Sequence, residues 1–295
     1  MYVISGATGR VGSAVADLLL TADHPVRVLV RREEAAEAWR SRGAEAVVVD
    51  LRESERLAEA LEGARSFFAL MPFDLTVADL DSYAGDVVDS VAAAVRVART
   101  PHTVMLSSGG ADLPAGTGPI VGLHMMEEAL KTTGTTLTAL RSGHFQEKFT
   151  DVLDAARHEG VFPVFADSAD TPIPMVATRD IAEIAVRELL AGPTVSEAVD
   201  IVGPSCTERE VADELGRALG RDLTVVTVPE AGWEEAFVEA GFAPHIAASL
   251  ADLYRADQRG DLDPRGDRSV EAPTRLPQTV DRVFASLGKD DSAGA

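Results

Sequence analysis

Four polar residues recur at helical spacing in the stretch LHMMEEALKTTG, which begins at Leu123. They are His124, Glu127, Glu128 and Lys131. On a helix this spacing places them along one face and leaves both methionines of the stretch on the face that packs. One hypothesis gives His124 a catalytic role, because an imidazole titrates near neutral pH and can act as an acid. The alternative is a solvated face on which Glu127 and Lys131 form an i, i+4 ion pair, and we expect that pair to be structural.

A glycine-rich segment near the start of the chain, ISGATGRVG, lies between a strand-like run and a helical pattern. Its residues after the strand are Gly6, Ala7, Thr8, Gly9, Arg10, Val11 and Gly12. Glycines at this turn allow a tight bend, a close approach of backbone to pyrophosphate, and close packing of helix on strand. The N–H groups of the following helix then face the phosphates. The segment therefore predicts a dinucleotide-binding loop, and the alternative is a structural glycine-rich turn.

The end of the second predicted strand distinguishes between the two nicotinamide dinucleotides. An NAD site usually carries an acidic residue about 20 residues after the loop, which binds the ribose 2′-hydroxyl. Here Arg31 and Arg32 follow the strand, and Glu33 comes only after them. An arginine can hold a 2′-phosphate, so we expect NADP(H) rather than NAD(H). The alternative is a solvated arginine pair that begins the next helix.

Two further residues close the third predicted strand at the place where an adenine ring would lie. They are Asp50 and Leu51. We expect both to line the cofactor site, although Asp50 could equally be the N-cap of the next helix.

The first half of the chain alternates short apolar runs with amphipathic helical patterns, as expected of parallel strands in an α/β doubly wound sheet. The apolar runs are Tyr2–Ser5, Val26–Val30, Ala46–Val49, Ser66–Leu70, Thr103–Leu106 and Thr136–Leu140. We predict a Rossmann domain over residues 1–150 with a returning segment at about 174–202. A smaller α/β substrate domain would take residues 151–173 and 203–288. The polar tail 289–295 is predicted to be disordered.

The composition narrows the classes of partner. The chain has 295 residues and a formal net charge of −21, which argues against nucleic acids and anionic membranes as partners. We find no apolar run near the roughly 20 residues of a membrane span, and no secretory signal. Cys206 is the only cysteine, which fits a cytoplasmic protein without internal disulfides. We find no cluster with metal-ligand spacing and no Gly-x-Ser-x-Gly elbow.

An ordered set of local patterns extends over about residues 1–288. It includes GATGRVG at Gly6, LSSGGAD at Leu106, EEALKTTG at Glu127, LRSGHFQE at Leu140, TRDIA at Thr178 and VGP at Val202. This set resembles the NmrA-like, atypical branch of the short-chain dehydrogenase/reductase superfamily. Members bind NADPH or NADH in a Rossmann domain, with a smaller domain over the nicotinamide end. Some reduce quinones, enones or related double bonds, and others bind the cofactor without turnover as redox-sensing regulators.

The resemblance implies roles for individual residues. The pyrophosphate would be held by Gly6, Thr8, Arg10, Val11 and Gly12, and Arg31 would bind the 2′-phosphate. The nicotinamide ribose would lie against Met71, Pro72 and Ser107. The backbone around Gly143, His144 and Phe145 would meet the nicotinamide.

The chain departs from the better-known short-chain reductases, which protonate a carbonyl with a Tyr-x-x-x-Lys pair. Its tyrosines are Tyr2, Tyr83 and Tyr254, and none precedes a lysine by four residues. The Phe-x-Glu-Asn ending that is common in the branch reads FQEK here, from Phe145.

Our first hypothesis is an NADPH-dependent reductase of a quinone, an enone or a similar apolar or aromatic electrophile, with His124, Ser107 and His144 as catalytic candidates. Pocket walls are expected from Phe149, Phe162, Phe165, Trp233, Phe237, Phe242 and Tyr254. The alternative is a cofactor-sensing protein with little turnover and a protein partner. Sugar-nucleotide epimerisation, which needs the absent tyrosine, ranks last, and a homodimer is left open.

Overall fold

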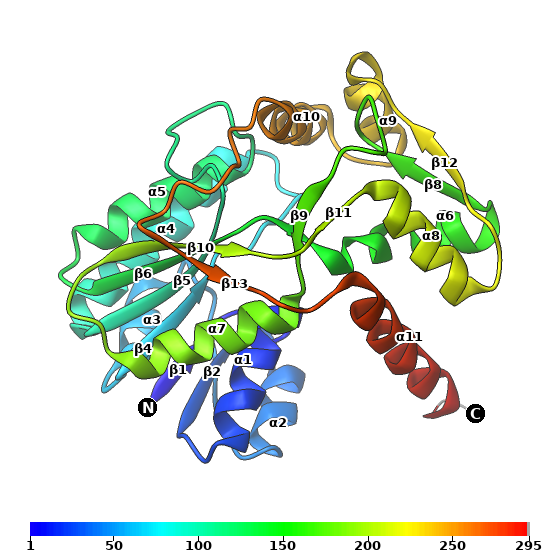
Figure 1. Cartoon of the computed structure of the whole chain (residues 1–295). Helices are drawn as coiled ribbons and strands as arrows, with labels where there is room; N and C mark the ends of the chain where they lie inside the picture. Colours follow the sequence, from blue (N-terminus) through cyan, green and yellow to red (C-terminus); the bar gives the residue numbers. More distant parts are fainter. Residues whose placement is uncertain (294–295) are drawn as a thin grey trace.

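An eight-stranded parallel sheet is the central layer of the larger part of the molecule (Figure 1). The computed structural model describes residues 1–293, and the side-chain surroundings of residues 1–287. The strand order is β13-β10-β6-β5-β4-β1-β2-β3. The strands are β1 (Tyr2–Ile4), β2 (Val26–Val30), β3 (Glu45–Val48), β4 (Ser66–Leu70), β5 (His102–Ser108), β6 (Thr136–Ser142), β10 (Glu197–Val202) and β13 (Arg268–Glu271). The predicted doubly wound fold is confirmed.

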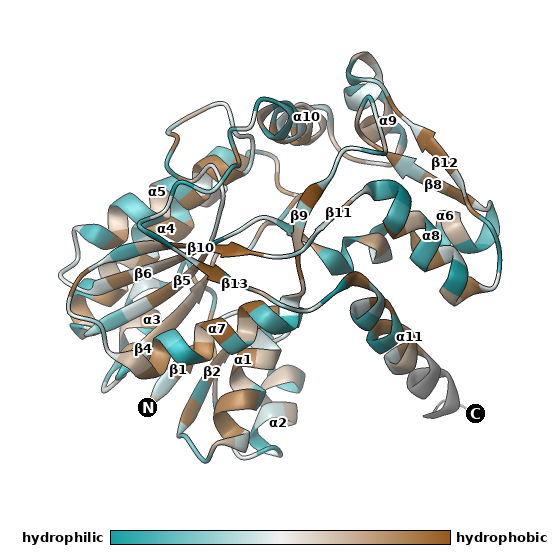
Figure 2. Ribbon diagram, in the orientation of Figure 1, coloured by the Kyte–Doolittle hydropathy of each residue, from teal (hydrophilic) through white to brown (hydrophobic). Residues whose placement is uncertain are grey.

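The central strands are largely buried because both faces of the sheet are covered. All three residues of β1 are buried, and Figure 2 shows brown residues along the strands and both brown and teal residues on the helices around them. Strand β1 pairs with β2 on one side and with β4 on the other, so the order of the chain reverses there. Doubly wound sheets bind ligands at such a switch point, at the carboxyl ends of the strands.

Three helices cover each face of the sheet. One layer is α1 (Arg10–Thr21), α2 (Glu33–Arg40) and α7 (Thr178–Ala191). The opposite layer is α3 (Ser54–Leu61), α4 (Leu80–Ala98) and α5 (Ile120–Lys131). Each layer forms its own apolar core against the sheet.

A smaller group of elements lies beyond the carboxyl edge of the sheet (Figure 1). Its strands pair as β11-β9-β7 and as β12-β8. The strands are β7 (His144–Phe145), β8 (Val161–Val164), β9 (Ile173–Val176), β11 (Ser205–Cys206) and β12 (Thr224–Thr227). The helices are η1 (Gln146–Val152), α6 (Leu153–His158), α8 (Glu208–Leu219), η2 (Glu230–Gly232), α9 (Trp233–Glu239), α10 (Pro244–Gln258) and α11 (Leu276–Ala293). Helix α8 begins with a capping box between Thr207 and Glu210.

Three details differ from the sequence prediction. Residues 268–271, assigned to the smaller domain, form β13, which extends the large sheet by pairing with the edge of β10. The sequence pattern of residues 149–159 predicts one helix, but the structure has two. The 3-10 helix η1 ends at Val152, and α6 begins after it. The tail expected to be disordered continues α11 as far as Ala293, and residues 294 and 295 lie outside the described part. Composition suggested disorder there, but propagating a helix adds a hydrogen bond with each residue.

Several aromatic residues expected to be pocket walls are core residues instead. Phe149 and Phe162 are buried in the core of the smaller group, and Trp233 is fully buried. Burying an aromatic ring removes about 150–250 Å² of its surface from water, which stabilises the fold more than leaving the ring exposed. Phe165, Phe242 and Tyr254 are only partly buried and lie at the edge of an aromatic cluster around Trp233.

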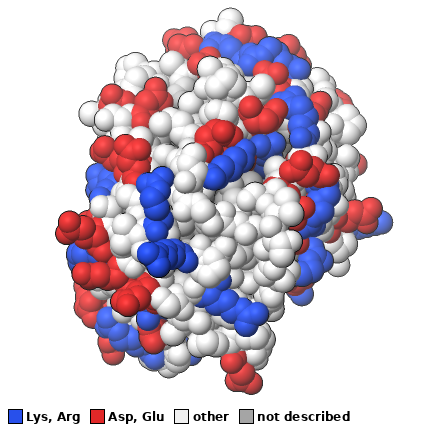
Figure 3. Space-filling model, turned by 90° about the vertical axis from the view of Figure 1, so that its left-hand side faces the viewer, with Lys and Arg blue, Asp and Glu red and all other residues white. Residues whose placement is uncertain are grey.

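Charged side chains of both signs are interspersed on the face shown in Figure 3. Many arginines there and elsewhere are neutralised by neighbouring carboxylates, as in the Arg255 contacts with Glu230 and Glu234. In the described part of the chain, every helix is too short or too polar to cross a bilayer.

A buried carboxylate joins the two parts of the molecule. Asp180, in the first turn of α7, accepts hydrogen bonds from Thr274 N at 2.8 Å and from Thr274 Oγ1 at 2.6 Å. Thr274 lies in the segment between β13 and α11, so these contacts fix the start of α11 against the sheet layer. Asp180 therefore lies at a helix start and also at the junction of the two parts.

Replacing this carboxylate should destabilise the fold. We expect Asp180→Ala to lower the free energy of unfolding by about 1–3 kcal/mol, because two donors of Thr274 lose a charged acceptor. The measurement is urea unfolding followed by tryptophan fluorescence and circular dichroism. Arg179→Ala is the control, since its exposed pair with Glu183 should be worth less than about 0.5 kcal/mol. Equal effects of the two variants would contradict the prediction.

Candidate functional site

The loop between β1 and α1 is shaped by two glycines. Gly6 has a φ of +68°, which an L side chain rarely adopts, and Gly9 N donates to Gly6 O at 2.9 Å. A Cβ added to Gly12 would lie 2.3 Å from Gly6 O, so a side chain there would push the helix away from the loop. Both glycines are therefore required for the tight strand-to-helix turn that the sequence predicted.

The start of α1 is open to an anion. No side chain caps the helix, and its first turn contains no acidic residue. Thr8, Gly9 and Arg10 are exposed at this end, whereas Ala7 and Val11 are buried in the core. The N-terminal N–H groups and the helix dipole together favour a phosphate at this position. Arg10 also donates to Thr150 Oγ1 at 2.7 Å, which connects the loop to η1.

Two arginines stand free at the end of β2. Within the described residues, neither Arg31 nor Arg32 takes part in an ion pair or a side-chain hydrogen bond. Glu33, the first carboxylate after them, is paired with Arg40 along α2. This arrangement leaves two unneutralised cations where the 2′ position of an adenosine ribose was expected.

Asp50 does not have the alternative role of a helix cap, because the N-cap of α3 is Glu53. Its carboxylate accepts hydrogen bonds from Arg52 Nε at 3.0 Å and Nη2 at 3.1 Å, and this pairing lowers the pKa of Asp50. Leu51 is half-buried against the core beneath α3 and α4. Both residues follow β3, at the same carboxyl edge of the sheet as Arg31.

A surface hollow of about 760 Å³ opens beside Asp50, between the β3–α3 turn and α4. Its lining includes the carboxylates Asp50, Glu53, Asp86 and Asp89 and the single guanidinium of Arg52. This excess of acid is unsuited to a pyrophosphate, so the hollow is not the phosphate site. The open start of α1 is the better anion site in spite of being less concave.

The residues expected beside the nicotinamide lie where β4, β5 and β6 end. Met71 is buried and Pro72 is half-buried directly after β4. Ser107 is the partner of Arg141 in the pairing of β5 with β6. Gly143 is exposed after β6, and Phe145 packs partly against the core under α1 and α7.

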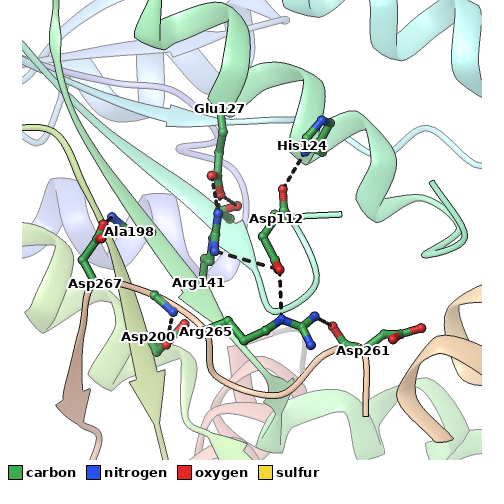
Figure 4. Close-up of polar contacts among 12 residues, drawn as sticks. Asp112, His124, Glu127, Arg141, Ala198, Asp200, Asp261, Arg265 and Asp267 are labelled. Atoms are coloured by element: carbon green, nitrogen blue, oxygen red, sulfur yellow. Dashed lines mark hydrogen bonds and ion pairs between the residues drawn. The ribbon is translucent and has the colours of Figure 1, made fainter. Parts of the chain in front are cut away.

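The hydroxyl of Ser107 belongs to a buried ionic network, whose Glu127 and Arg141 are shown in Figure 4. Ser107 Oγ donates to Glu127 Oε1 at 2.6 Å, and Arg141 donates to the same carboxylate at 3.1 and 2.7 Å. Glu127 is 1% exposed and Arg141 is 7% exposed. Burial disfavours the charged guanidinium, but the hydrogen bonds and charge of Glu127 outweigh it, so the pKa of Arg141 is raised.

The contacts of Glu127 in this network differ from those predicted for it on α5. Glu127 faces inward to Arg141, whereas Lys131 pairs with Glu128 at 2.7 Å on the surface. Met126 is buried but Met125 is 36% exposed, so the two methionines do not share the packed face. The predicted Glu127–Lys131 pair was wrong because a buried arginine on β6 offers that carboxylate a stronger partner than an exposed lysine.

Around the network lie more charged groups that the sequence did not indicate. Asp112 Oδ1 lies 3.9 Å from Arg141 Nη1, and Arg265 Nε donates to Asp112 Oδ2 at 2.9 Å (Figure 4). Asp200 on β10 accepts from Gly266 N at 2.6 Å, and burial raises the pKa of Asp200. The segment that carries Arg265 is thereby held against the β5–α5 loop.

His124 is fixed by the loop beside it. Its Nδ1 lies 2.9 Å from the carbonyl oxygen of Ala111, so Nδ1 carries the proton that the carbonyl accepts. The neutral ring then has only a lone pair on Nε2, and it can accept a proton there but cannot donate one. Of the three catalytic candidates, Ser107 contacts Glu127, His124 contacts Ala111 and His144 contacts Asp257, so they belong to three separate sets of contacts.

Two polar contacts connect residues 144–148, which follow β6, to α10. His144 Nε2 lies 3.1 Å from Asp257 Oδ1, and Lys148 Nζ donates to Tyr254 Oη at 2.7 Å. Lys148 is an exposed residue, and although partial desolvation acts to lower its pKa, Tyr254 and the nearby carboxylates outweigh that effect and raise it. Burial raises the pKa of Glu208, which faces Lys148 and His144 from the start of α8.

Sequence reasoning missed the contribution of Lys148, Tyr254 and Asp257 to this group. Their only signal is matching spacing, since Tyr254 and Asp257 are three residues apart and His144 and Lys148 are four apart. Such spacing is common, and nothing local indicates that α10 returns over η1. In the described residues we find no group of side chains that could hold a metal ion.

The chain is similar to known proteins that are named as reductases. The sequence pattern of the NmrA-like family matches residues 2–281. An NAD(P)H azoreductase of Xenophilus azovorans is 28% identical over 260 residues, which are 86% of each chain. A (4-alkanoyl-5-oxo-2,5-dihydrofuran-3-yl)methyl phosphate reductase of Streptomyces griseus is 33% identical over 225 residues, 76% of this chain and 75% of the relative.

The fold is also that of a solved reductase. The NADPH-dependent quinone oxidoreductase of Escherichia coli, solved with NADPH, superposes with a TM-score of 0.74 at 22% sequence identity. The superposition covers 96% of this chain and 100% of that protein.

The buried ionic network gives a stability prediction. We expect Glu127→Ala to lower the free energy of unfolding by about 3–5 kcal/mol, because it leaves the guanidinium of Arg141 buried without its closest carboxylate. Chemical unfolding is the measurement. Glu128→Ala, one residue away on the exposed side, is the matched control and should change stability by about 1 kcal/mol or less. A Glu127→Ala protein as stable as its control would show that the network contributes nothing.

Proposed function

The chain belongs to the NmrA-like family, and from that premise we propose that it is an NADPH-dependent reductase of a quinone, an enone or a similar apolar electrophile. The observation that carries the proposal is the uncapped start of α1 beside Gly6 and Gly12. A side chain at Gly12 would collide with the loop, and the open helix end suits a pyrophosphate. The family premise and this turn support the same cofactor class.

Free cations support NADPH over NADH. Arg31 and Arg32 follow β2 without carboxylate partners, and Glu33 is held by Arg40. A 2′-phosphate between these guanidinium groups would gain charge-assisted hydrogen bonds, whereas a 2′-hydroxyl would not. The reductases named in the comparisons include one that uses NAD(P)H and one solved with NADPH.

The residues at the carboxyl edge of the sheet would hold the nicotinamide end. NADPH bound there would supply a hydride. Gly143, exposed at the end of β6, would lie beside the nicotinamide ring, and Ser107, whose hydroxyl is fixed by Glu127, would lie beside the attached ribose. The smaller group of elements would exclude water above them, and we assign it the substrate-binding role.

Partly exposed aromatic side chains and the relatives' names both favour an apolar electrophile. Phe165, Phe242 and Tyr254 are partly exposed at the edge of the aromatic cluster. The relatives named above act on azo compounds, on an oxo-dihydrofuran that carries an alkanoyl group, and on quinones. All three are reductases, which favours turnover over the sensing alternative.

Turnover across a panel of acceptors tests the proposal. Wild-type protein should oxidise NADPH with at least one of 1,4-benzoquinone, menadione, 2-cyclohexenone or an azo dye, at rates well above the protein-free reaction. NADH should be used less efficiently. Absorbance at the nicotinamide band follows the reaction, and a heat-treated sample is the control. If no acceptor is reduced but NADPH binds, the reductase proposal fails and the sensing alternative gains support.

Arg31 gives a sharper test of cofactor choice. We expect Arg31→Ala to weaken NADPH binding by about 10- to 100-fold, the loss of one charge-assisted hydrogen bond or more, while NADH binding changes less than about threefold. Titration calorimetry with each cofactor is the measurement. Arg99→Ala, which removes an exposed arginine at the far end of α4, is the control for net charge. An equal loss for both cofactors would contradict the assignment of Arg31 to the 2′-phosphate.

A further inference from the structure

A tyrosine and a lysine from distant parts of the chain meet over the carboxyl edge of the sheet. Lys148 lies in η1, five residues after Gly143, and Tyr254 lies in α10. Their Nζ and Oη atoms are 2.7 Å apart. One turn along each element, His144 and Asp257 form the second contact between the same two segments. The two contacts hold the Tyr254 hydroxyl about one helical turn from the place where His144 leaves the sheet.

The direction of the Lys148 contact determines what the phenol can do. An ammonium group has three donors and no acceptor, so Lys148 donates and the phenol oxygen accepts. The O–H bond of Tyr254 is therefore free to donate to a third group. Of the two nearest alternatives, His124 in its neutral form has no free donor, and His144 directs Nε2 to Asp257.

The ring of Tyr254 is held from the opposite side. It packs against Phe165, Trp233 and Phe237, with ring centroids 5.5, 5.7 and 5.8 Å away. Trp233 is itself fully buried and donates to Val228 O at 2.8 Å. Aromatic contacts of this kind restrict the side chain, so the hydroxyl has a defined position beside Lys148.

Helix α10 is fixed over the sheet edge by a close backbone contact. A Cβ on Gly118, which has a φ of +57°, would lie 2.2 Å from Ser249 O. Leu253, next to Tyr254, packs against the core between the sheet and α5. The position of Tyr254 relative to β5 and β6 is thus set by packing and not by a flexible loop.

From this juxtaposition we propose that Tyr254 donates the proton in reductions that place a new hydrogen on carbon, with Lys148 as its positioning residue. The inference rests on the proposed reductase function, and it deepens it by favouring electron-poor carbon–carbon double bonds conjugated to a carbonyl. A protein that reduces only quinones has no need of such a donor, because a hydroquinone oxygen exchanges its proton with water.

The atoms and electrons balance. The hydride that NADPH would supply, leaving NADP⁺, would add with its two electrons to the β-carbon of the enone, and the electrons of the carbon–carbon π bond would form the enolate. The Tyr254 O–H bond then breaks, its proton forms the α-carbon–hydrogen bond, and the electron pair remains on the phenol oxygen. The Lys148 ammonium stabilises that negative charge, and water returns the proton to the phenolate.

The kinetic test compares two acceptors in one protein. In Tyr254→Phe, which keeps the ring in the aromatic cluster, kcat for 2-cyclohexenone should fall by about 10²- to 10⁴-fold, the usual contribution of a positioned acid. The kcat for 1,4-benzoquinone should fall by less than about threefold. Tyr2→Phe, which removes a hydroxyl at the opposite edge of the sheet, is the matched control and should leave both rates unchanged. Lys148→Met should reproduce the selective loss and Lys148→Arg should restore most of it.

A second measurement needs no cofactor and no turnover. The anion of 4-nitrophenol presents an oxyanion to the free Tyr254 O–H and absorbs visibly, so its binding to the cofactor-free protein can be titrated. Tyr254→Phe should weaken that binding about 10-fold or more, and Tyr2→Phe should leave it unchanged.

The outcomes separate the two proposals. If wild type reduces no acceptor, the reductase function fails, whereas the nitrophenolate titration still tests the Tyr254 donor. If wild type reduces enones and Tyr254→Phe does so equally well, the donor role is overturned and the reductase function stands. A wild type that reduces quinones but no enone, or nitrophenolate binding that ignores Tyr254, also overturns the inference.

Discussion

The buried carboxylate of Glu147 is the contact on which the arrangement of the two parts depends. It accepts hydrogen bonds from Thr178 N at 3.0 and 3.1 Å and from Thr178 Oγ1 at 2.7 Å, at the start of α7. A carboxylate at this position satisfies an N-terminal donor and complements the helix dipole. Because α7 packs on α1 and the sheet, the chain leaving β6 is held to the nucleotide half at one defined point. The neighbouring Gln146 extends the same junction by donating to Met175 O and Thr274 O.

This anchoring explains why FQEK can serve both halves of the molecule. Gln146 and Glu147 point into the junction and are almost fully buried, whereas His144 and Lys148 face α10. A 3-10 helix turns by three residues, so successive side chains leave in different directions and one short segment contacts two neighbours. Because Gln146 and Glu147 are fixed in the junction, His144 and Lys148 are fixed as well, and so are their contacts with α10.

The parts of the structure that the sequence could predict are those coded locally. The glycine loop, the parallel strands and the Thr207 capping box each depend on residues within a few positions of one another. The partners of Glu127 and Lys148 were not predictable in this way. Glu127 is paired across 14 residues by the register of β6 against β5, and Tyr254 meets Lys148 across 106 residues. Periodicity identified a polar face on α5, but only the position of Arg141 in the sheet decides that Glu127 belongs to the interior.

The negative net charge of the protein restricts where a nucleotide can bind. A chain with a net charge of −21 repels a nucleotide that carries several phosphates, so attraction has to come from local groups. Most arginines of the molecule are neutralised by carboxylates, as Arg27, Arg141 and Arg268 are. Arg10, Arg31 and Arg32 are in no ion pair within the described residues, and all three lie around the open start of α1 and the end of β2. Leaving these cations unpaired in so acidic a protein costs favourable surface contacts and gives the anion site a positive charge that attracts a polyphosphate at short range.

The position of the proposed proton donor also differs from that in a Tyr-x-x-x-Lys pair. In a Tyr-x-x-x-Lys pair both residues lie on one helix beside the sheet, so the acid reaches a substrate carbonyl from the side of the nucleotide half. Here α5 supplies neither residue, and the tyrosine and lysine that do meet lie on α10 and η1, over the carboxyl edge. An acid on α10 would approach the substrate from the side of the smaller group of elements, away from the nucleotide. Hydride and proton would then enter from opposite sides, which suits addition across a carbon–carbon double bond better than reduction of an isolated carbonyl.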